Sequence, residues 1–293
     1  MSAPLTRRKL LTGGAAITAG SALGVETAAA PRDRPLTMKL GMISYNVGKD
    51  WDLPTLIHHA KAAGLQGLEL RTQHAHGVEP TIGADMRKEV KQRFTDAGMT
   101  LWGLGTTCEF QSPDAATVRT NIEECKRWCE LGQDLGAHGV KVRPNGLPKE
   151  VAVEKTLAQI GDSLRECGQA AEAHGVEIWL EVHGAGTMEP PNIRAILDHC
   201  KRPNVGACWN SNKTDILNGS VKTYFDLLRP DIKSCHINDL WDEGYPYREL
   251  FSLFEQTGYD RFTLCEVGAS IKPEDGVTFL QCYHGLWREL ARG

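Results

Sequence analysis

One pattern recurs along most of this chain and constrains its fold more than any other feature. An amphipathic, helix-like stretch ends at a glycine or proline, and a short apolar segment with polar residues at its end follows. A glycine after a helix supplies the left-handed residue that ends it. Short, continuous apolar segments are typical of strands in a parallel sheet that is covered on both faces. The repeat therefore predicts alternating helices and parallel strands.

The pattern predicts eight strands and eight helices. The strands are expected within residues 39–45, 63–71, 97–104, 136–143, 174–183, 203–210, 230–238 and 258–267. The helices are expected over residues 53–63, 84–97, 114–135, 149–174, 190–200, 220–228, 246–257 and 275–291. Such strict alternation leaves a closed barrel or an open doubly wound sheet. Because the first strand lacks the Gly-x-Gly-x-x-Gly turn of dinucleotide-binding sheets, we expect an α/β fold, a single-domain (β/α)8 TIM barrel over residues 38–293.

The first thirty residues are expected to be a targeting segment. Arg7, Arg8 and Lys9 precede a mildly apolar stretch, and the small residues 28–30 follow it. This arrangement resembles a twin-arginine signal peptide, although Leu10 stands where such signals often carry Phe. We therefore expect export, to the periplasm, with residues 1–30 removed and residues 31–37 as a linker; a retained basic anchor is the alternative.

Charge and hydropathy argue against two classes of partner. The formal net charge is −4, and it becomes −6 without the first thirty residues. A nucleic-acid partner normally requires a basic patch that releases phosphate counterions, so none is expected. After the targeting segment, the chain holds no apolar run of the roughly 20 residues that a membrane span needs, so the mature chain is expected to be soluble.

Four polar residues stand at the ends of four successive predicted strands, each within apolar sequence. They are Glu181, Asn210, His236 and Glu266. In a TIM barrel, the carboxyl ends of the strands meet around one pocket. Two carboxylates buried side by side are costly unless a cation neutralises them. The set therefore predicts a site for Mn²⁺, Mg²⁺, Co²⁺ or Zn²⁺, whereas the alternative is four separately satisfied polar groups.

The motifs around these residues resemble a known superfamily. Glu-Val-His-Gly at 181–184, Cys-Trp-Asn-Ser-Asn at 208–212, Cys-His-Ile-Asn-Asp at 235–239 and Cys-Glu-Val at 265–267 are similar to those of the xylose isomerase-like sugar phosphate isomerases and epimerases. The resemblance spans residues 38–290. It implies that Glu181, position 210, His236 and Glu266 hold the metal, and that the two glutamates transfer protons in catalysis.

Two positions depart from this resemblance. Asn210 stands where the family usually has Asp, so the charge of the implied ligand set falls from −3 to −2. An amide still offers a carbonyl oxygen to a metal, but the affinity is expected to be weaker and the ion a stronger Lewis acid. Lys213 stands where the family has a substrate-facing His. Both changes argue against a standard ketose epimerase.

Further residues near the strand ends are candidates for contact with a substrate. They are His183, Lys213, Arg143, Asp239, His74, His76 and Trp209. His183 lies two residues after Glu181 and so on the same face of a continued strand. Asp239 is also a candidate for orienting a metal ligand. Each has a simpler reading as a surface, core or rim residue; Trp209, for example, is explained equally well by core packing.

The residues and the resemblance together predict a metal-dependent carbohydrate isomerase or epimerase that transfers protons through an enediolate. One alternative is a lyase that eliminates the aglycone of a 3-keto-glycoside. Another is a non-catalytic sugar-binding barrel, which Asn210 favours. An abasic-site endonuclease is disfavoured by the acidic charge and by the lack of additional histidine ligands. The expected partner is a small carbohydrate, and the resemblance is compatible with a homo-oligomer.

Overall fold

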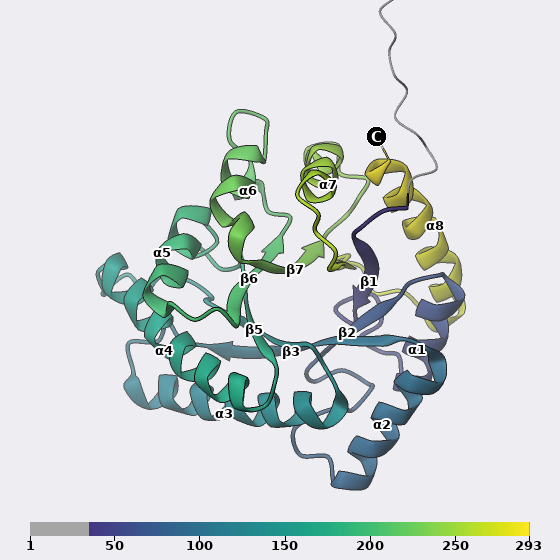
Figure 1. Ribbon diagram of the computed structural model, residues 1–293, viewed down its shortest axis with the longest axis horizontal. Helices are drawn as coiled ribbons and strands as arrows, with labels where there is room; N and C mark the ends of the chain where they lie inside the picture. Colours follow the sequence, from purple (N-terminus) through teal and green to yellow (C-terminus); the bar gives the residue numbers. More distant parts are fainter. Residues whose placement is uncertain (1–34, 293) are drawn as a thin grey trace, which may run out of the picture. The chain divides into compact units, whose positions relative to one another are not determined.

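A computed structural model describes residues 35–292 of the chain. Within them, eight parallel strands form a barrel with helices around it (Figure 1). The strands hydrogen-bond in sequence order, and β8 pairs with β1 to close the ring. The predicted TIM barrel is thereby confirmed. The predicted signal peptide, residues 1–30, lies outside the described residues, as does most of the predicted linker.

The strands and helices alternate as the repeat predicts. The strands are β1 (Lys39–Ile43), β2 (Gly67–Arg71), β3 (Thr100–Glu109), β4 (Gly139–Arg143), β5 (Glu177–Glu181), β6 (Val205–Asn210), β7 (Ile232–Ile237) and β8 (Phe262–Cys265). The helices are α1 (Leu53–Ala62), α2 (Ala84–Ala97), α3 (Ala115–Leu135), α4 (Val153–Ala173), α5 (Pro190–Cys200), α6 (Lys222–Leu228), α7 (Tyr247–Gln256) and α8 (Pro273–Ala291). Two short 3₁₀ turns, η1 (Lys213–Asp215) and η2 (Arg229–Asp231), flank α6.

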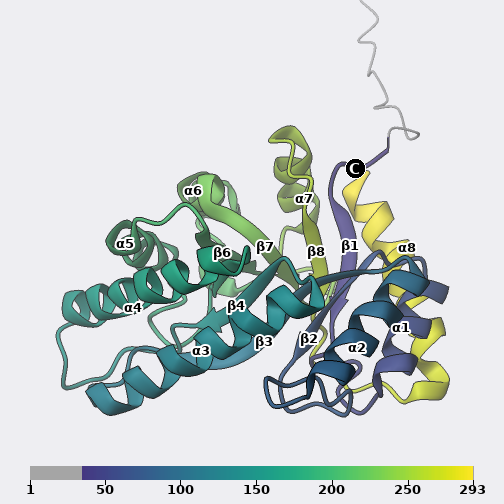
Figure 2. The ribbon, with the colours of Figure 1, turned by 60° about the horizontal axis from the view of Figure 1, so that its bottom comes forward.

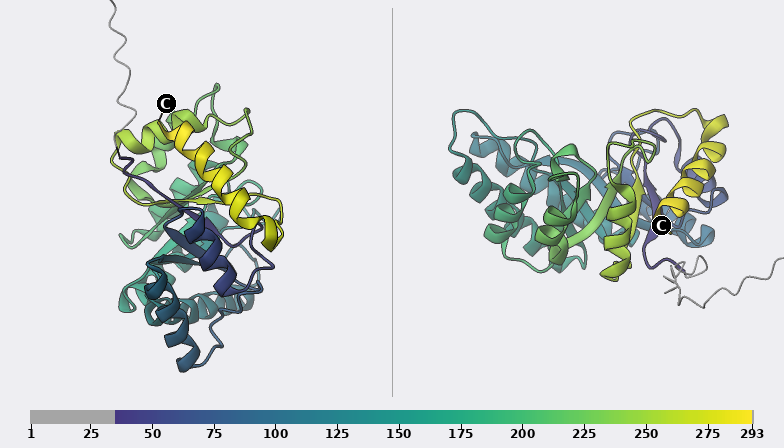
Figure 3. Two further views of the ribbon diagram at one scale, coloured as in Figure 1. Left: turned by 90° about the vertical axis from the view of Figure 1, so that its right-hand side faces the viewer. Right: turned by 90° about the horizontal axis from the view of Figure 1, so that it is seen from above.

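Local signals set the helix boundaries. Asp52 caps α1 by accepting a 2.9 Å hydrogen bond from the Thr55 backbone N–H. Gly98 and Gly136 end α2 and α3 with φ angles of 63° and 77°, where a residue with a side chain would be strained. Each stop turns the chain back towards the next strand. The helices consequently lie outside the barrel, with α8 packed between α1 and α7 (Figures 2 and 3).

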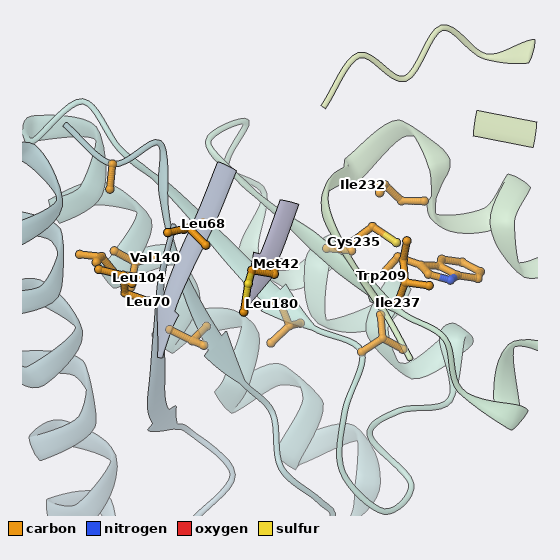
Figure 4. Packing of buried hydrophobic residues seen from close by; sticks show 14 of the residues in the cluster. Met42, Leu68, Leu70, Leu104, Val140, Leu180, Trp209, Ile232, Cys235 and Ile237 are labelled. Atoms are coloured by element: carbon orange, nitrogen blue, oxygen red, sulfur yellow. The ribbon is translucent and has the colours of Figure 1, made fainter. Parts of the chain in front are cut away.

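The outer core lies between the strands and the helices. Leu68, Leu70, Leu104, Val140 and Leu180 are fully buried there (Figure 4). Because successive side chains of a strand point to opposite faces, the neighbours of these residues face the barrel interior. The outer layer thus fixes which residues are directed inward.

Aromatic rings fill the amino-terminal half of the barrel interior. Trp102 stacks on Trp179 with ring centroids 5.0 Å apart, and Phe262 lies 4.9 Å from Trp102. Glycines make room for them, since a Cβ atom at Gly139 would lie only 2.3 Å from the Trp179 ring. This layer closes the barrel from below and confines any ligand to the carboxyl ends of the strands. Among residues 35–292, none of the helices has the length and apolar character required to span a bilayer.

Candidate active site

A cavity of about 440 Å³ opens at the carboxyl ends of the strands. Its lining comes from the ends of every strand except β3 and from the residues that immediately follow them. Its size is within the range of small-molecule sites. The strand ends are also where TIM-barrel proteins place their active sites. The cavity is therefore the place to test the residues that the sequence singled out.

Three of the four predicted metal ligands gather beside this cavity, which Glu181 and Glu266 line and His236 adjoins from its buried position. Glu181, His236 and Glu266 each offer an atom within 4.8 Å of the others. His236 Nδ1 lies 3.6 Å from Glu181 Oε1 and 3.4 Å from Glu266 Oε2. This nitrogen is buried and has no hydrogen-bond partner among residues 35–292. The three side chains thus form a candidate cation site.

The second ring nitrogen of His236 is held by a buried carboxylate. Nε2 lies 3.1 Å from Glu69 Oε2, and both side chains are fully buried. When Nε2 donates to Glu69, the lone pair of Nδ1 faces Glu181 and Glu266, as a histidine ligand of a metal requires. Burial by itself would lower the pKa of His236, but the neighbouring Cys208, Glu266 and Glu69 raise it well above its usual value. The cluster therefore attracts a positive charge, whether a proton or a metal ion.

Asn210 adjoins the cluster but turns its nitrogen towards it. Its Nδ2 donates to Glu181 Oε1 at 3.3 Å, while its Oδ1 accepts from Asn238 Nδ2 at 3.4 Å. A half-turn of the terminal amide would exchange the two atoms and bring the oxygen to the Glu181 side. Asn210 is thus placed to be the fourth ligand, although its oxygen does not face the cluster in this arrangement.

A buried lysine that the sequence analysis overlooked completes the cluster. Lys141, in the middle of β4, places Nζ 2.7 Å from Glu181 Oε2, and their side chains are only 5% and 4% exposed. Burial by itself would lower the pKa of Lys141, but the carboxylates of Glu181 and Glu69 outweigh it and raise the pKa. Burial would likewise raise the pKa of Glu181, but Lys141 and His236 hold it well below its usual value. The two form a buried ion pair.

Three of the predicted substrate-contacting residues line the cavity. They are Arg143, His183 and Asp239. Arg143 forms an ion pair with Glu109 at the end of β3. Asp239 has one buried carboxylate oxygen, Oδ1, without a hydrogen-bond partner among the described residues. All three are therefore accessible to a ligand in the cavity.

Trp209 does not reach the cavity, and its prediction as a substrate contact is wrong. It is fully buried beneath α6 and α7, where its Nε1 donates to Tyr245 Oη at 3.0 Å and its ring meets Phe225 edge to face (Figure 4). The reason is strand alternation: Asn210 points inward, so Trp209 points outward. It belongs to the outer core.

Lys213 also lies outside the cavity lining, contrary to the prediction. It sits in η1 with its side chain 68% exposed, and its Nζ pairs with Asp242 Oδ2 at 2.9 Å. Asn212, the residue before it, is the last lining residue of this segment. Lys213 is a solvent-exposed member of a surface ion pair.

His74 and His76 are not among the lining residues of the cavity, although His74 stacks on Tyr45, which lines it, and their prediction as substrate contacts stays a prediction. His74 Nδ1 is 2.9 Å from Ser44 Oγ. His76 Nε2 is 2.8 Å from the Arg71 carbonyl oxygen, and its Nδ1 accepts from the Val78 N–H at 3.0 Å. Burial lowers the pKa of each histidine to about 4, with Arg71 adding to the effect at His74. Both side chains are uncharged near neutral pH.

The closed ring of parallel strands and the polar cavity at their carboxyl ends define the protein as a TIM barrel with a ligand site of the usual position. Over residues 57–280, the sequence matches the family described as xylose isomerase-like TIM barrel, and the chain belongs to that family. A comparison with curated protein sequences found no match.

Several solved structures share the fold. L-ribulose 3-epimerase aligns with a TM-score of 0.72 and 16% identity, over 87% of this chain and 96% of its own. The IolI protein with a bound zinc atom aligns with a TM-score of 0.71 and 19% identity, over 87% and 98%. The 3-keto-D-glucoside 4-epimerase YcjR from E. coli aligns with a TM-score of 0.70 and 16% identity, over 86% and 99%. At these identities the likeness concerns the fold.

Proposed function

We propose that the protein is a metal-dependent carbohydrate isomerase or epimerase that transfers a proton through an enediolate. The single observation that carries this proposal is the convergence of ligand atoms of Glu181, His236 and Glu266 within 4.8 Å of one another, where Glu181 and Glu266 line the cavity. Sugar epimerases among the structures of the same fold support it. The substrate class is a small carbohydrate with a carbonyl group, because an enediolate forms only beside a carbonyl.

The donor set fits a divalent ion. Glu181, His236 and Glu266 would hold it, with Asn210 joining through its carbonyl oxygen after the amide turns over. The unpartnered Nδ1 of His236, backed by Glu69 on the other side of the ring, is the feature of the structure that such an ion would satisfy. When bound, Mn²⁺, Mg²⁺, Co²⁺ or Zn²⁺ would supply Lewis acidity that stabilises negative charge on the substrate oxygens.

The two glutamates are not equivalent as bases. Glu181 is tied to Lys141 at 2.7 Å and to Asn210 at 3.3 Å, and its pKa is held well below the usual value. Such a carboxylate is a weak base. Glu266 has His236 as its only ion-pair partner among the described residues, and its side chain is partly exposed to the cavity. We assign removal of the substrate C–H proton to Glu266, with Glu181 as the second carboxylate of the proton-transfer pair.

Solvent deuterium incorporation tests this assignment. The purified protein, supplied with Mn²⁺ in D₂O, is incubated with a panel of keto-sugars and 3-keto-glycosides, and the products are followed by NMR. We expect deuterium at the carbon beside the carbonyl. Glu266→Gln should slow the exchange by roughly 10²–10⁴-fold, the usual contribution of a positioned general base.

The deuterium experiment has a matched control and two alternative outcomes. Glu274→Gln removes a carboxylate from the first turn of α8, away from the cavity, and should leave the exchange unchanged. Release of an aglycone would replace the isomerase by the alternative lyase. Binding of sugars without deuterium exchange or aglycone release would leave a non-catalytic sugar-binding barrel, the function that Asn210 favours.

The predicted export is also proposed. It is supported by Arg7, Arg8 and the small residues 28–30. Expression in a bacterial host, followed by amino-terminal sequencing of the periplasmic protein, should give a mature chain that begins close to residue 31. Replacement of both arginines by lysine should keep the protein in the cytoplasm; periplasmic recovery of that variant would contradict the proposal.

A further inference from the structure

The inner wall of the cavity near β1 and β2 carries a fixed guanidinium. Arg71, at the end of β2, lines the cavity and is half buried. Its Nη1 donates to the Thr72 carbonyl at 2.8 Å, and its Cζ lies 5.6 Å from the Tyr45 ring centroid. Tyr45 stacks in turn on His74. These contacts hold the side chain in place without neutralising it.

Arg71 differs from the other cations of the cavity because it lacks an acidic partner. Lys141 pairs with Glu181, and Arg143 pairs with Glu109. Within residues 35–292, no carboxylate forms a salt bridge with Arg71, and its guanidinium donates its hydrogen bond to a neutral carbonyl. Burial and the nearby Arg143 lower the pKa of Arg71, and the more distant carboxylates of Glu181 and Glu79 offset this only in part. A half-buried guanidinium in this state favours an anionic ligand.

The cavity is polarised from one side to the other. Its cations stand on β2 and β4: Arg71 and Arg143 at the strand ends, and Lys141 paired with Glu181, which ends β5. The carboxylates Asp239 and Glu266 follow β7 and β8, which lie in the other half of the ring from β2 and β4. A ligand that reaches from one half to the other therefore meets carboxylates and the candidate cation site at one end, and Arg71 at the other.

We propose that the carbohydrate is a sugar acid, and that its carboxylate pairs with Arg71 while its carbonyl end meets the Glu181, His236 and Glu266 cluster. The proposal rests on the proposed function and narrows its substrate class. One unpaired guanidinium matches a carboxylate in charge and in two-pronged geometry. A phosphate dianion would need a second free cation, and Lys141 and Arg143 are already paired.

Binding measurements on three related compounds test the proposal. Fructose, fructuronate and fructose 6-phosphate share a keto-hexose skeleton and differ at carbon 6. Each is titrated calorimetrically into the full-length protein in the presence of Mn²⁺. We expect fructuronate to bind roughly 10- to 100-fold more tightly than fructose, the usual gain from a charged hydrogen-bonded pair. Added salt should reduce this preference.

Variants assign the preference to one side chain. Arg71→Gln should abolish it, and Arg71→Lys should retain part of it, because the charge remains but the planar fork is lost. Arg93→Gln, which removes an exposed arginine of α2, should keep the full preference. Should Arg71→Gln fail to fold, the lysine variant and the salt dependence still decide the question.

Each outcome has one meaning. Equal affinity for fructose and fructuronate, or no binding of fructuronate, overturns the proposal. Tighter binding of fructose 6-phosphate than of fructuronate overturns the assignment to a carboxylate. Deuterium exchange without a preference for the carboxylate leaves the proposed function intact and removes only this inference. A preference for the carboxylate without deuterium exchange leaves the inference about Arg71 intact and removes the proposed isomerase or epimerase function.

Discussion

Replacing Lys141 by Met tests whether the buried ion pair is a structural part of the site. Methionine keeps the length and most of the volume of the side chain but removes the ammonium group. Glu181 would then keep its hydrogen bond from Asn210, but it would lose its 2.7 Å contact with a cation. In the metal-free protein His236, 3.6 Å away, would be the cation left beside this buried carboxylate among the described residues.

The magnitude follows from the burial of the pair. Because the side chains of Lys141 and Glu181 are only 5% and 4% exposed, solvent does not screen the interaction appreciably. Removal of one partner from a buried pair costs about 3–5 kcal/mol of folding free energy. In a domain of this size each kcal/mol lowers the melting temperature by roughly 2 °C, so the expected fall is about 6–10 °C.

Thermal unfolding measured by circular dichroism in the presence of a chelator is the assay. Lys213→Met is the matched control, since Lys213 makes an ion pair of similar length, 2.9 Å, but with side chains 68% and 45% exposed. Exposed pairs contribute only about 0–1 kcal/mol, so the control should melt within about 2 °C of the wild type.

Added Mn²⁺ should then raise the melting temperature of Lys141→Met more than that of the wild type. The ion would restore a positive charge beside Glu181 and would no longer be repelled by Lys141. If Lys141→Met melted no lower than Lys213→Met in the chelator, the ion pair would not be a stabilising part of the cluster, and the reasoning would fail.

Two further predictions concern Asn210 and Asp215. Asn210→Asp should lower the melting temperature in a chelator, because a third carboxylate would stand beside Glu181, but should strengthen Mn²⁺ binding by roughly tenfold or more, measured by calorimetry. Burial raises the pKa of Asp215 to about 8 despite hydrogen bonds from the Asn212 N–H and Tyr245 Oη. That folded pKa lies above the unfolded value of 3.8. The contribution of Asp215 to the free energy of unfolding is therefore complete below about pH 4 and is lost as the pH rises to about 8. Urea midpoints should therefore fall between pH 5 and 8 in the wild type relative to Asp215→Asn, and parallel curves would contradict this.

The helices were predictable because their boundaries are local. Glycine stops and caps act within a few residues of the chain, and α2 and α5 fall on the predicted residues. The third strand was predicted too short, since it continues beyond residue 104 to Glu109, through Gly105 and two threonines that look like a loop. Gly103 and Gly105 both lie within this strand. The glycines are needed there because Trp179 and Glu69, distant in sequence, occupy the space of their missing side chains.

The candidate cluster was predictable only in part. Glu181, His236 and Glu266 stood out because a charge within an apolar strand needs a partner. Lys141 is also a charge within a strand segment, Gly-Val-Lys-Val-Arg, and so also needs a partner. It was missed because a lysine is not a metal ligand. The direction of Trp209 could have been predicted from Asn210. Because neighbouring residues of a strand face opposite sides, an inward Asn210 implies an outward Trp209.

The loop after the second strand was beyond the reach of sequence reasoning. His74 and His76 are placed by contacts with Ser44 and with backbone groups, and such a path depends on the whole loop. The same loop carries no regular pattern from which a face could be inferred. Arg71, the last residue of β2, was by contrast placed at a strand end by its position alone.

Lys141 and Asn210 change the charge of the cluster in the same direction. Relative to the three-carboxylate set that the resemblance implies, Asn210 removes one negative charge, and Lys141 offsets another at Glu181. The cluster therefore has less need of a metal ion to keep its carboxylates ionised. The same ion pair occupies Glu181 and leaves Glu266 as the carboxylate with a free approach to the cavity. A single buried lysine is thus expected to weaken metal binding and to make the two glutamates unequal. Lys141→Met should therefore strengthen metal binding and make the two glutamates more alike.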